Sequence, residues 1–559
     1  MRAGARVLGV ILLGAATWPV PARAQAPYDS GGPLMPEQAA FDVLYNDLAL
    51  RVQPADSSID GSLRVWARIA SPTEWLVLDL DEALRVGWVS AVPDRAGESP
   101  VRLRFVRRGG RIWIEFPAMR QPGDVVAVEI GYGGRPRIAP NPPWDGGFIW
   151  ATTPAGDPWI ATAVQQEGAD LWWPVKDHPS DEPDSMALHI TVPEPLVVAS
   201  NGRLRDLRHN DDGTVTYDWF VSTPINSYNV ALNIAPYRLL EAPFESVSGD
   251  TFPIELFVLP EDVEKGRALL PEIEDHLRFF ERNLGPYPFR RDKYGVAQTP
   301  YLGMEHQSII AYGANFDDGA MTGGVDWGFD ALHQHEASHE WWGNLVTNAD
   351  WKDMWLHEGF ASYMQPLYLE QTQGREAYDA YMASIRPRIT NAAPVAPRAS
   401  RSSGQMYGGD IYFKGAWILH TLRYLIGDDA MALALRRMAY PDPALESTTD
   451  GRAARFATTD DFRHIAEAAS GMDLDWFFEV YLRQPVLPRL EAQRTPEGLD
   501  LRWVVPDALA FPMPVEIEVD GERRRIEMPD GTARVSLPLG AAFRLDPGSA
   551  ILKDESGRP

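Results

Sequence analysis

The order of hydrophobic and polar residues divides the chain into a strand-rich first part, a helix-rich middle and a strand-rich end. From residue 38 to about 245, hydrophobic residues alternate with polar ones, as in SLRVWARI at 62–69, which is the period of a half-buried strand. Turns rich in Gly, Pro and Asp separate similar segments at 74–80, 111–117, 124–132 and 214–221. This pattern predicts an N-terminal β-sandwich-like domain with long loops.

The pattern changes at about residue 246. The segment 261–285 has a helical pattern and ends at Gly285, a residue typical of helix C-termini. The segment 303–313 reads as extended. Further helices are predicted at 326–343, 353–373, 410–426, 428–439, 459–469 and 473–484. We therefore expect a mainly helical α+β region.

Alternating segments return after Pro485, at 499–505, 513–528 and 531–539. Asp520-Gly521 and Asp530-Gly531 are dipeptides typical of tight turns. The sequence thus predicts a multidomain α+β protein with a small C-terminal β domain. The predicted boundaries are 1–24 for a signal peptide, 28–245 and 246–485 for the first two domains, and 486–559 for the last.

The first residues are typical of an export signal. Arginines precede an apolar run that begins at Val7, and small residues follow it, so we expect cleavage after Ala24 or Ala26. The alternative is a membrane anchor, but the apolar run is short and is broken by Pro19 and Pro21. No later segment is long and apolar enough to span a bilayer. We expect export from a bacterial cell, into the periplasm or the extracellular medium.

Composition narrows the classes of function. The 559 residues are 45% hydrophobic and 23% charged, which is typical of a globular chain of about three to five domains. A net charge of −26 repels phosphate backbones, so we expect no nucleic-acid partner. The chain has no cysteine, and any metal site must therefore use histidines and carboxylates.

The stretch HQHEASHE at 333–340 concentrates three histidines and two glutamates. On a helix, His335 and His339 share one face and can reach one ion. Glu336 is rotated by about 100° and can reach a water on that ion. A catalytic zinc usually takes three protein ligands and one water, and Glu358, at the start of the next predicted helix, can supply the third. The alternative is a solvated polar face with surface histidines.

Two further histidines lie beside this set. His333, one turn before the motif on another face, is expected at the surface or behind the ligands. His357 adjoins Glu358 and is expected either to support it or to lie in an ordinary loop. With one zinc ion bound, the arrangement predicts hydrolysis, because zinc activates a water and polarises a carbonyl. Glu336 would then act as general base, while the spacing does not identify a donor for the oxyanion.

Three blocks carry a resemblance to a known family. GMEH at 303–306, HEASHEWWGN with WLHEGFA, and YFKG at 412–415 resemble, in order and spacing, the gluzincin aminopeptidases of the aminopeptidase N and leukotriene A-four hydrolase family. The likeness continues through 165–185, 200–204 and 475–490. It implies a thermolysin-like zinc catalytic domain at 246–485. It also implies a secreted zinc aminopeptidase that hydrolyses the N-terminal bond of peptides, with zinc-activated water as nucleophile.

The resemblance also implies residue roles. Tyr412 would donate a hydrogen bond to the oxyanion. Glu305 would bind the free α-ammonium of the substrate, and Glu167 would be a second carboxylate for that amine. Gly303 and Met304 would lie on a strand that pairs with the substrate backbone. Two carboxylates would make internal peptide bonds poor substrates, because such bonds bring no positive charge.

The chain departs from the family pattern at Leu302, His306, Glu340, Trp341, Trp342 and His357. None of these is a predicted ligand or base, but the first two border the expected amine site. Many members also carry a large helical C-terminal domain, whereas the pattern here is β. We therefore expect a more open cleft, or one that a partner closes.

Other functions stay open at this point. An endopeptidase or dipeptidyl-type metallopeptidase would use the same zinc centre, and a non-catalytic peptide-binding protein would keep only the fold. Epoxide hydrolysis, found in one branch of the family, is a special case. The expected partners are peptides with a free N-terminus, and the sequence sets no oligomeric state.

Overall fold

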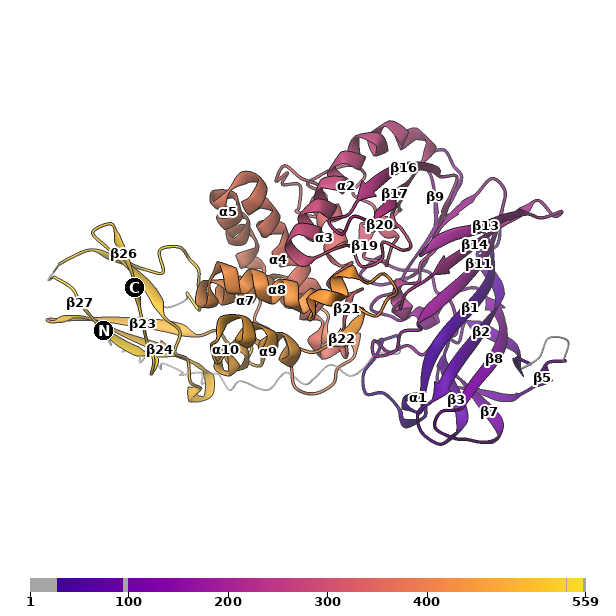
Figure 1. Cartoon of the computed structure of the whole chain (residues 1–559), viewed down its shortest axis with the longest axis horizontal. Coiled ribbons are helices and arrows are strands. Elements are labelled where there is room, and N and C mark those ends of the chain that lie inside the picture. The colour runs from indigo at the N-terminus through magenta and orange to yellow at the C-terminus, as the bar shows by residue number, and fades with distance from the viewer. Residues whose placement is uncertain (1–27, 94–98, 539, 556–559) are drawn as a thin grey trace, which may run out of the picture.

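The computed structural model describes residues 28–93, 99–538 and 540–555, and the predicted signal peptide lies outside these residues. Three parts follow one another along the long axis of the molecule: a sheet-rich first part, a helical middle, and two small sheets near the C-terminus (Figure 1). The predicted fold class is confirmed. Within the described ranges, no helix is both long and apolar enough to cross a membrane.

The first part is built around an eight-stranded sheet with the order β13-β14-β11-β1-β2-β8-β4-β5. Its central strand β1 (Phe41–Gln53) pairs antiparallel with β2 (Ser58–Ile69) and parallel with β11 (Ser185–Pro193). The alternation seen in the sequence reflects one face of this sheet packed on the core. The other strands are β4 (Leu84–Ala91), β5 (Val101–Arg102), β8 (Val125–Gly134), β13 (Arg203–His209) and β14 (Thr214–Val221).

Two smaller sheets complete this part. One has the order β3-β7-β6 and the other β12-β15-β10-β9. Their strands are β3 (Thr73–Asp79), β6 (Arg104–Arg108), β7 (Arg111–Arg120), β9 (Gly147–Thr152), β10 (Pro158–Ala163), β12 (Val197–Ala199) and β15 (Asn233–Ala235), and a short helix α1 (Pro36–Ala39) precedes β1. All five strands predicted in this part occur, as parts of β2, β3, β7, β8 and β14, although the predicted segments 74–80 and 124–132 each extend one residue beyond the observed strand.

A five-stranded sheet with the order β16-β17-β18-β20-β19 begins the second part. Its strands are β16 (Arg238–Glu245), β17 (Thr251–Val258), β18 (Tyr294–Gln298), β19 (Gly303–Met304) and β20 (Ile310–Tyr312). The segment predicted as extended thus forms the last two strands, with β19 at the edge. The boundary predicted between 245 and 246 lies in the turn that joins β16 to β17, so β16 belongs with this second sheet.

The helices form the middle of the molecule. They are α2 (Val263–Leu284), α3 (Ala331–Ser338), α4 (Trp355–Gln373), α5 (Arg375–Ile385), α6 (Ser403–Met406), α7 (Gly409–Ile426), α8 (Asp428–Ala439), α9 (Thr459–Ser470) and α10 (Asp475–Leu482), with a two-stranded sheet of β21 (Val346–Asn348) and β22 (Arg455–Ala457). Six of the seven predicted helices agree to within two residues at each end. The short helices α5 and α6 were not predicted.

The predicted helix 326–343 is wrong in length, because α3 covers only Ala331–Ser338. The side chain of Asp330 accepts a hydrogen bond from the backbone N–H of His333 at 2.9 Å, which fixes the start of the helix. After Ser338 the chain turns so that Trp341 and Trp342 enter the core. Burial of two large aromatic side chains thus outweighs continuation of the helix.

The C-terminal sheets have the orders β23-β24-β27 and β26-β25-β28. Their strands are β23 (Arg489–Thr495), β24 (Gly498–Val504), β25 (Val515–Val519), β26 (Glu522–Ile526), β27 (Thr532–Ser536) and β28 (Phe543–Leu545). As predicted, Asp520-Gly521 makes the tight turn between β25 and β26, with φ of 52° and 85°. The Phe511 ring contacts Trp476 of α10, with centroids 5.3 Å apart, so these sheets share the core of the helices.

Candidate metal centre and substrate cavity

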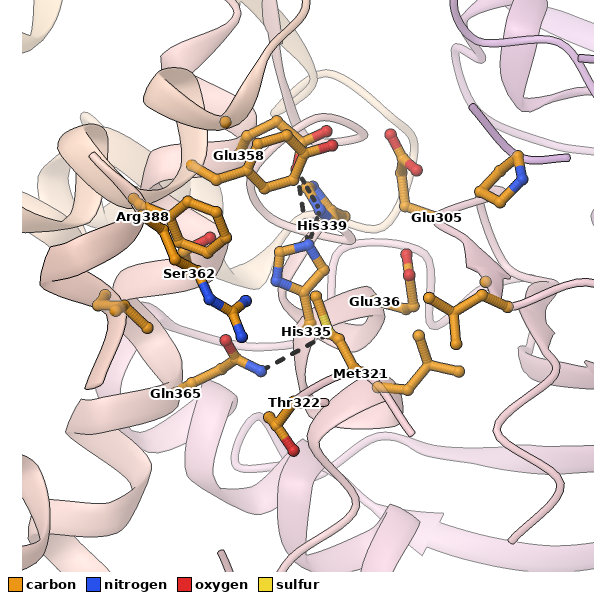
Figure 2. A pocket seen from close by; sticks show the side chains of 18 of the residues that line it. Glu305, Met321, Thr322, His335, Glu336, His339, Glu358, Ser362, Gln365 and Arg388 are labelled. Atoms are coloured by element: carbon orange, nitrogen blue, oxygen red, sulfur yellow. Dashed lines mark hydrogen bonds and ion pairs between the residues drawn. The ribbon is translucent and has the colours of Figure 1, made fainter. Parts of the chain in front are cut away.

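Three side chains direct one ligand atom each toward a common point (Figure 2). The Nε2 atoms of His335 and His339 are 3.3 Å apart, and each lies 3.5 Å from Oε2 of Glu358. A tetrahedral zinc ion with ligands at about 2.1 Å has edges of about 3.4 Å between ligand atoms. The three predicted ligands therefore fit one zinc ion, with the remaining position toward the cavity that all three line.

The charges at this centre also favour a bound cation. Although burial lowers the pKa of an imidazole, the carboxylates of Glu305, Glu358 and Glu336 raise the pKa of His339 to about 10. Oε2 of Glu358 is buried and accepts no hydrogen bond. In the described part of the chain, none of these carboxylates pairs with Lys or Arg. A buried set of carboxylates without such a partner is stabilised by a divalent ion.

The turn after α3 fixes the orientation of the His339 ring. Its Nδ1 lies 2.8 Å from the carbonyl oxygen of Trp342, so Nδ1–H donates to this oxygen and the lone pair of Nε2 is left for the ion. Because α3 ends early, the Trp342 carbonyl can accept this hydrogen bond from His339. In a continued helix the same carbonyl would accept a backbone N–H.

The two neighbouring histidines support this region from behind. His333 is fully buried, and the expectation of a surface position is wrong. Its Nδ1 lies 2.8 Å from Nδ1 of His276, and its Nε2 lies 2.9 Å from the Tyr294 hydroxyl. Nε2 of His357 accepts the backbone N–H of Asn348 at 2.9 Å, which holds the segment that leads into α4.

Two glycines bring α4 and α7 into backbone contact beside the ligand Glu358. A Cβ atom on Gly359 would lie 2.9 Å from Cα of Gly415, and one on Gly415 would lie 2.8 Å from Cα of Gly359. Only glycine permits this approach. Glu358 of α4 and Tyr412 of α7 thereby face the same cavity.

Glu336 lies next to the ligands and against the edge strand β19. A Cβ atom on Gly303 would lie 2.6 Å from Oε1 of Glu336, so a side chain at residue 303 would displace the carboxylate. Burial, reinforced by Glu305, raises the pKa of Glu336. Gly303, Met304 and Glu336 all line the cavity, which places the predicted base beside the predicted substrate strand.

Glu305 is buried in the wall of the cavity. It accepts hydrogen bonds from the hydroxyl of Tyr228, at 3.1 Å, and from Nε2 of Gln165. Burial raises its pKa. Both partners come from the first part of the chain, so this carboxylate lies where the two parts meet.

Glu167 does not line the cavity. The chain makes a tight turn in which the N–H of Gly168 bonds to the carbonyl of Val164 at 2.8 Å. Gln165 thereby faces Glu305, whereas Glu167 lies against the backbone of Gly146. Burial raises the pKa of Glu167 to about 7. Beside Glu305 the structure thus has an amide, Gln165, where a second carboxylate was expected.

Tyr412 lies against the ligand set. Its ring stacks on His335 with centroids 6.2 Å apart and an angle of 21°, and its hydroxyl bonds to that of Tyr407. The Tyr407 hydroxyl also donates to Oε1 of Gln165 at 3.4 Å. Burial raises the pKa of both phenols, so both keep a proton to donate. Sequence reasoning missed Tyr407, Gln165 and Tyr228, because no spacing rule links them to the metal motif.

The cavity has a volume of about 540 Å³, a size that accommodates a small ligand. Its wall beyond the ligands is mostly apolar, with Leu332, Trp327, Ile385 and Phe413 among the lining residues. The three carboxylates of the lining, Glu305, Glu336 and Glu358, lie at and beside the metal centre. The arrangement suits a substrate with one positive end and an apolar body.

Comparison with known proteins identifies the family. The description "Peptidase family M1 domain" matches residues 272–481, and "Peptidase M1 N-terminal domain" matches residues 42–229. Aminopeptidase N of Haemonchus contortus is 24% identical over 421 residues, which are 68% of this chain and 41% of that protein. Endoplasmic reticulum aminopeptidase 1 of Homo sapiens is 24% identical over 409 residues, 69% of this chain and 42% of that protein. The chain thus spans about two fifths of the length of these relatives.

Solved structures agree with this assignment. A mutant M1 zinc metallopeptidase of Deinococcus radiodurans, bound to a Tyr-Ser-Ala substrate, superimposes with a TM-score of 0.65 at 25% identity and covers 83% of this chain and 98% of that one. Another structure of that metallopeptidase gives a TM-score of 0.64 at 25% identity, with the same coverage. The two family descriptions together match more than half of the residues. The protein described here therefore belongs to peptidase family M1.

Proposed function

We propose that this protein is an exported zinc aminopeptidase that removes the N-terminal residue of peptides. The observation that carries the proposal is the position of Glu305. This buried carboxylate shares the cavity with the metal ligands and, among the described residues, has no Lys or Arg partner. A free α-ammonium would neutralise it, whereas an internal segment of a peptide would leave it without a positive partner.

The chain's own residues can carry out the hydrolysis. When bound, zinc would polarise the scissile carbonyl and lower the pKa of a water molecule. Glu336 accepts a proton as the water oxygen bonds to the carbonyl carbon, and returns it to the leaving nitrogen as the C–N bond breaks. The Tyr412 hydroxyl donates a hydrogen bond to the carbonyl oxygen that gains charge.

The edge strand β19 supports the same substrate orientation. Gly303 and Met304 pair with β20 on one side only, so the other edge can accept the backbone of an extended peptide. Glu305 follows directly in the chain. A peptide added at this edge would bring its N-terminus to Glu305 and its first carbonyl to the metal ligands.

A panel of fluorogenic aminoacyl amides, with and without a chelator, tests the proposal. We expect hydrolysis that the chelator abolishes and added zinc restores. Glu336→Gln should retain zinc, measured by metal analysis, and lose turnover. A non-catalytic binding protein would show no turnover in either form.

N-acetylated versions of the same substrates separate the exopeptidase from its alternatives. Because acetylation removes the positive charge, we expect these substrates to be cleaved much more slowly than the free amines. Efficient hydrolysis of acetylated or internally quenched peptides would instead support an endopeptidase. Release of dipeptides from free N-termini would support a dipeptidyl-type enzyme.

Export is supported by the basic residues and the apolar run of the first 24 residues. N-terminal sequencing of the protein from a bacterial periplasm or culture medium should begin at Gln25 or Pro27. An intact Met1 on material from those fractions would contradict cleavage.

A further inference from the structure

Arg388 is the one permanently charged cation among the described residues that line the cavity. It follows α5 in a short 3₁₀ turn, Arg386–Arg388. Among the described residues that line the cavity, it is the only Lys or Arg, whereas Glu305, Glu336 and Glu358 are carboxylates. A protein with a net charge of −26 therefore places one cation at its substrate cavity.

The guanidinium of Arg388 packs on an aromatic ring but has no carboxylate partner among the described residues. It lies over the Phe413 ring, 5.0 Å from the ring centroid, a contact that leaves its N–H donors available. In the described part of the chain, no carboxylate forms an ion pair with it. Arg386, two residues earlier, behaves differently, because it donates to the carbonyl of Lys553 at 2.7 Å and packs over Trp417. The N–H donors of Arg388 can therefore bind a carboxylate.

The position of Arg388 relative to the metal centre follows from three contacts. Arg388 lies over Phe413, the Phe413 ring is 6.2 Å from that of Tyr412, and Tyr412 stacks on His335. In Figure 2, Arg388 and Glu305 lie on opposite sides of His335 and His339. A substrate with its ammonium at Glu305 and its first carbonyl at the metal centre therefore extends its leaving part toward Arg388.

We infer that Arg388 binds a carboxylate on the leaving side of the substrate and so sets a preference for substrates that carry one there. This inference rests on the proposed aminopeptidase function. The carboxylate has two possible sources, which are the C-terminus of a very short peptide and an acidic side chain just after the scissile bond. An anion there meets Arg388, whereas beside the metal centre it would meet carboxylates.

Two matched pairs of substrates test the inference and distinguish the sources. Ala-Ala against Ala-Ala-amide differs only in the terminal carboxylate. Ala-Glu-amide against Ala-Gln-amide differs only in the side-chain carboxylate. Since Arg388 is exposed, we expect at least one acid to be preferred by about 3- to 30-fold in kcat/KM, mainly through a lower KM. Arg388→Ala should remove this preference, and Arg388→Lys should retain part of it.

Arg291→Ala is the control, because Arg291 is also exposed but does not line the cavity. It should leave both ratios unchanged. Alanine p-nitroanilide, which has a neutral leaving part, should be cleaved equally by wild type and Arg291→Ala and reports the aminopeptidase function itself. If wild type cleaves the anilide but Arg388→Ala keeps both acid-to-amide ratios, the Arg388 inference fails and the proposed function stands. If wild type cleaves none of these substrates, both fail.

Discussion

The hydroxyl groups of Tyr407 and Tyr412 lie 2.5 Å apart, and the Tyr407 hydroxyl continues to Gln165, whose amide bonds to Glu305. A line of hydrogen bonds therefore joins the proposed oxyanion donor to the proposed ammonium site. Because the phenol of Tyr412 already has a partner, the position of its oxygen is set before substrate binds, and its proton turns from Tyr407 to the substrate oxygen on binding.

Tyr412→Phe should lower kcat by about 100- to 1000-fold with little change in KM, because the lost hydrogen bond forms mainly in the transition state. Tyr407→Phe removes only the partner that orients Tyr412, so we expect a loss of roughly tenfold or less. Steady-state kinetics on one aminoacyl amide measures both. A larger loss for Tyr407→Phe than for Tyr412→Phe would reverse the assigned roles.

Glu305→Gln should weaken the use of substrates with a free N-terminus. The ammonium would lose its carboxylate partner, and we expect kcat/KM to fall on the order of 30- to 1000-fold. Acetylated substrates carry no charge to lose, so their residual rate should not fall. If the ratio of the hydrolysis rates of free-amine and acetylated substrates is unchanged, Glu305 does not bind the substrate ammonium.

Gly303→Ala tests the contact between β19 and the base. The added methyl group would displace the Glu336 carboxylate, which lies 2.6 Å from its position. Small displacements of a catalytic group can cost on the order of 100-fold in rate, and we expect such a loss in kcat with zinc content unchanged. Gly548→Ala, where a Cβ atom meets nothing within 4 Å, is the control. Wild-type kcat in Gly303→Ala would show that Glu336 tolerates the displacement.

The raised pKa of the buried Glu167 predicts that the stability of the folded protein depends on pH. Burial raises its pKa from 4.5 to about 7, so the folded state keeps a proton that the unfolded state releases. Its contribution to stability is present below about pH 4.5 and is lost as the pH rises through about 7. Glu167→Gln cannot ionise and should be more stable than wild type at pH 8, by about 1–3 kcal/mol. Urea unfolding at pH 4.5 and pH 8 measures the difference, which should vanish at the lower pH.

The same variant tests the role that the family resemblance implied for Glu167. Since Glu167 lies outside the cavity wall, KM for a free-amine substrate should change by less than about threefold. A large rise in KM, without loss of stability, would show that Glu167 contributes to binding of the substrate ammonium. Gln165→Ala, at the position that faces Glu305, should raise KM more.

The proximity of His335 and His339 could be predicted from sequence because helical geometry fixes the relation of the two side chains. The amine site could not be predicted as reliably. Whether Gln165 or Glu167 faces Glu305 depends on a tight turn, and a turn has no periodicity that assigns side chains to a face. For His333 the surface and a position behind the ligands could not be distinguished for a similar reason, since its partners His276 and Tyr294 are distant in sequence and give no local signal.

The strands and most helices were predictable because one buried face repeats along each element. The end of α3 was not, because Trp341 and Trp342 fit a helical pattern and a turn equally well. Their burial is decided by contacts with other elements, such as the stacking of Trp341 on Phe280 at 5.3 Å.

At Glu305, residues from the first part of the chain meet residues from the second part. The three ligands, Glu336 and Tyr412 all come from the second part of the chain, whereas Tyr228 and Gln165 reach Glu305 from the first. Under the proposed function, bond cleavage thus depends on residues of the second part, and the choice of where to cut depends on how the two parts pack against each other. A change that loosens the contact between the two parts should therefore weaken the preference for free N-termini before it lowers the rate of hydrolysis.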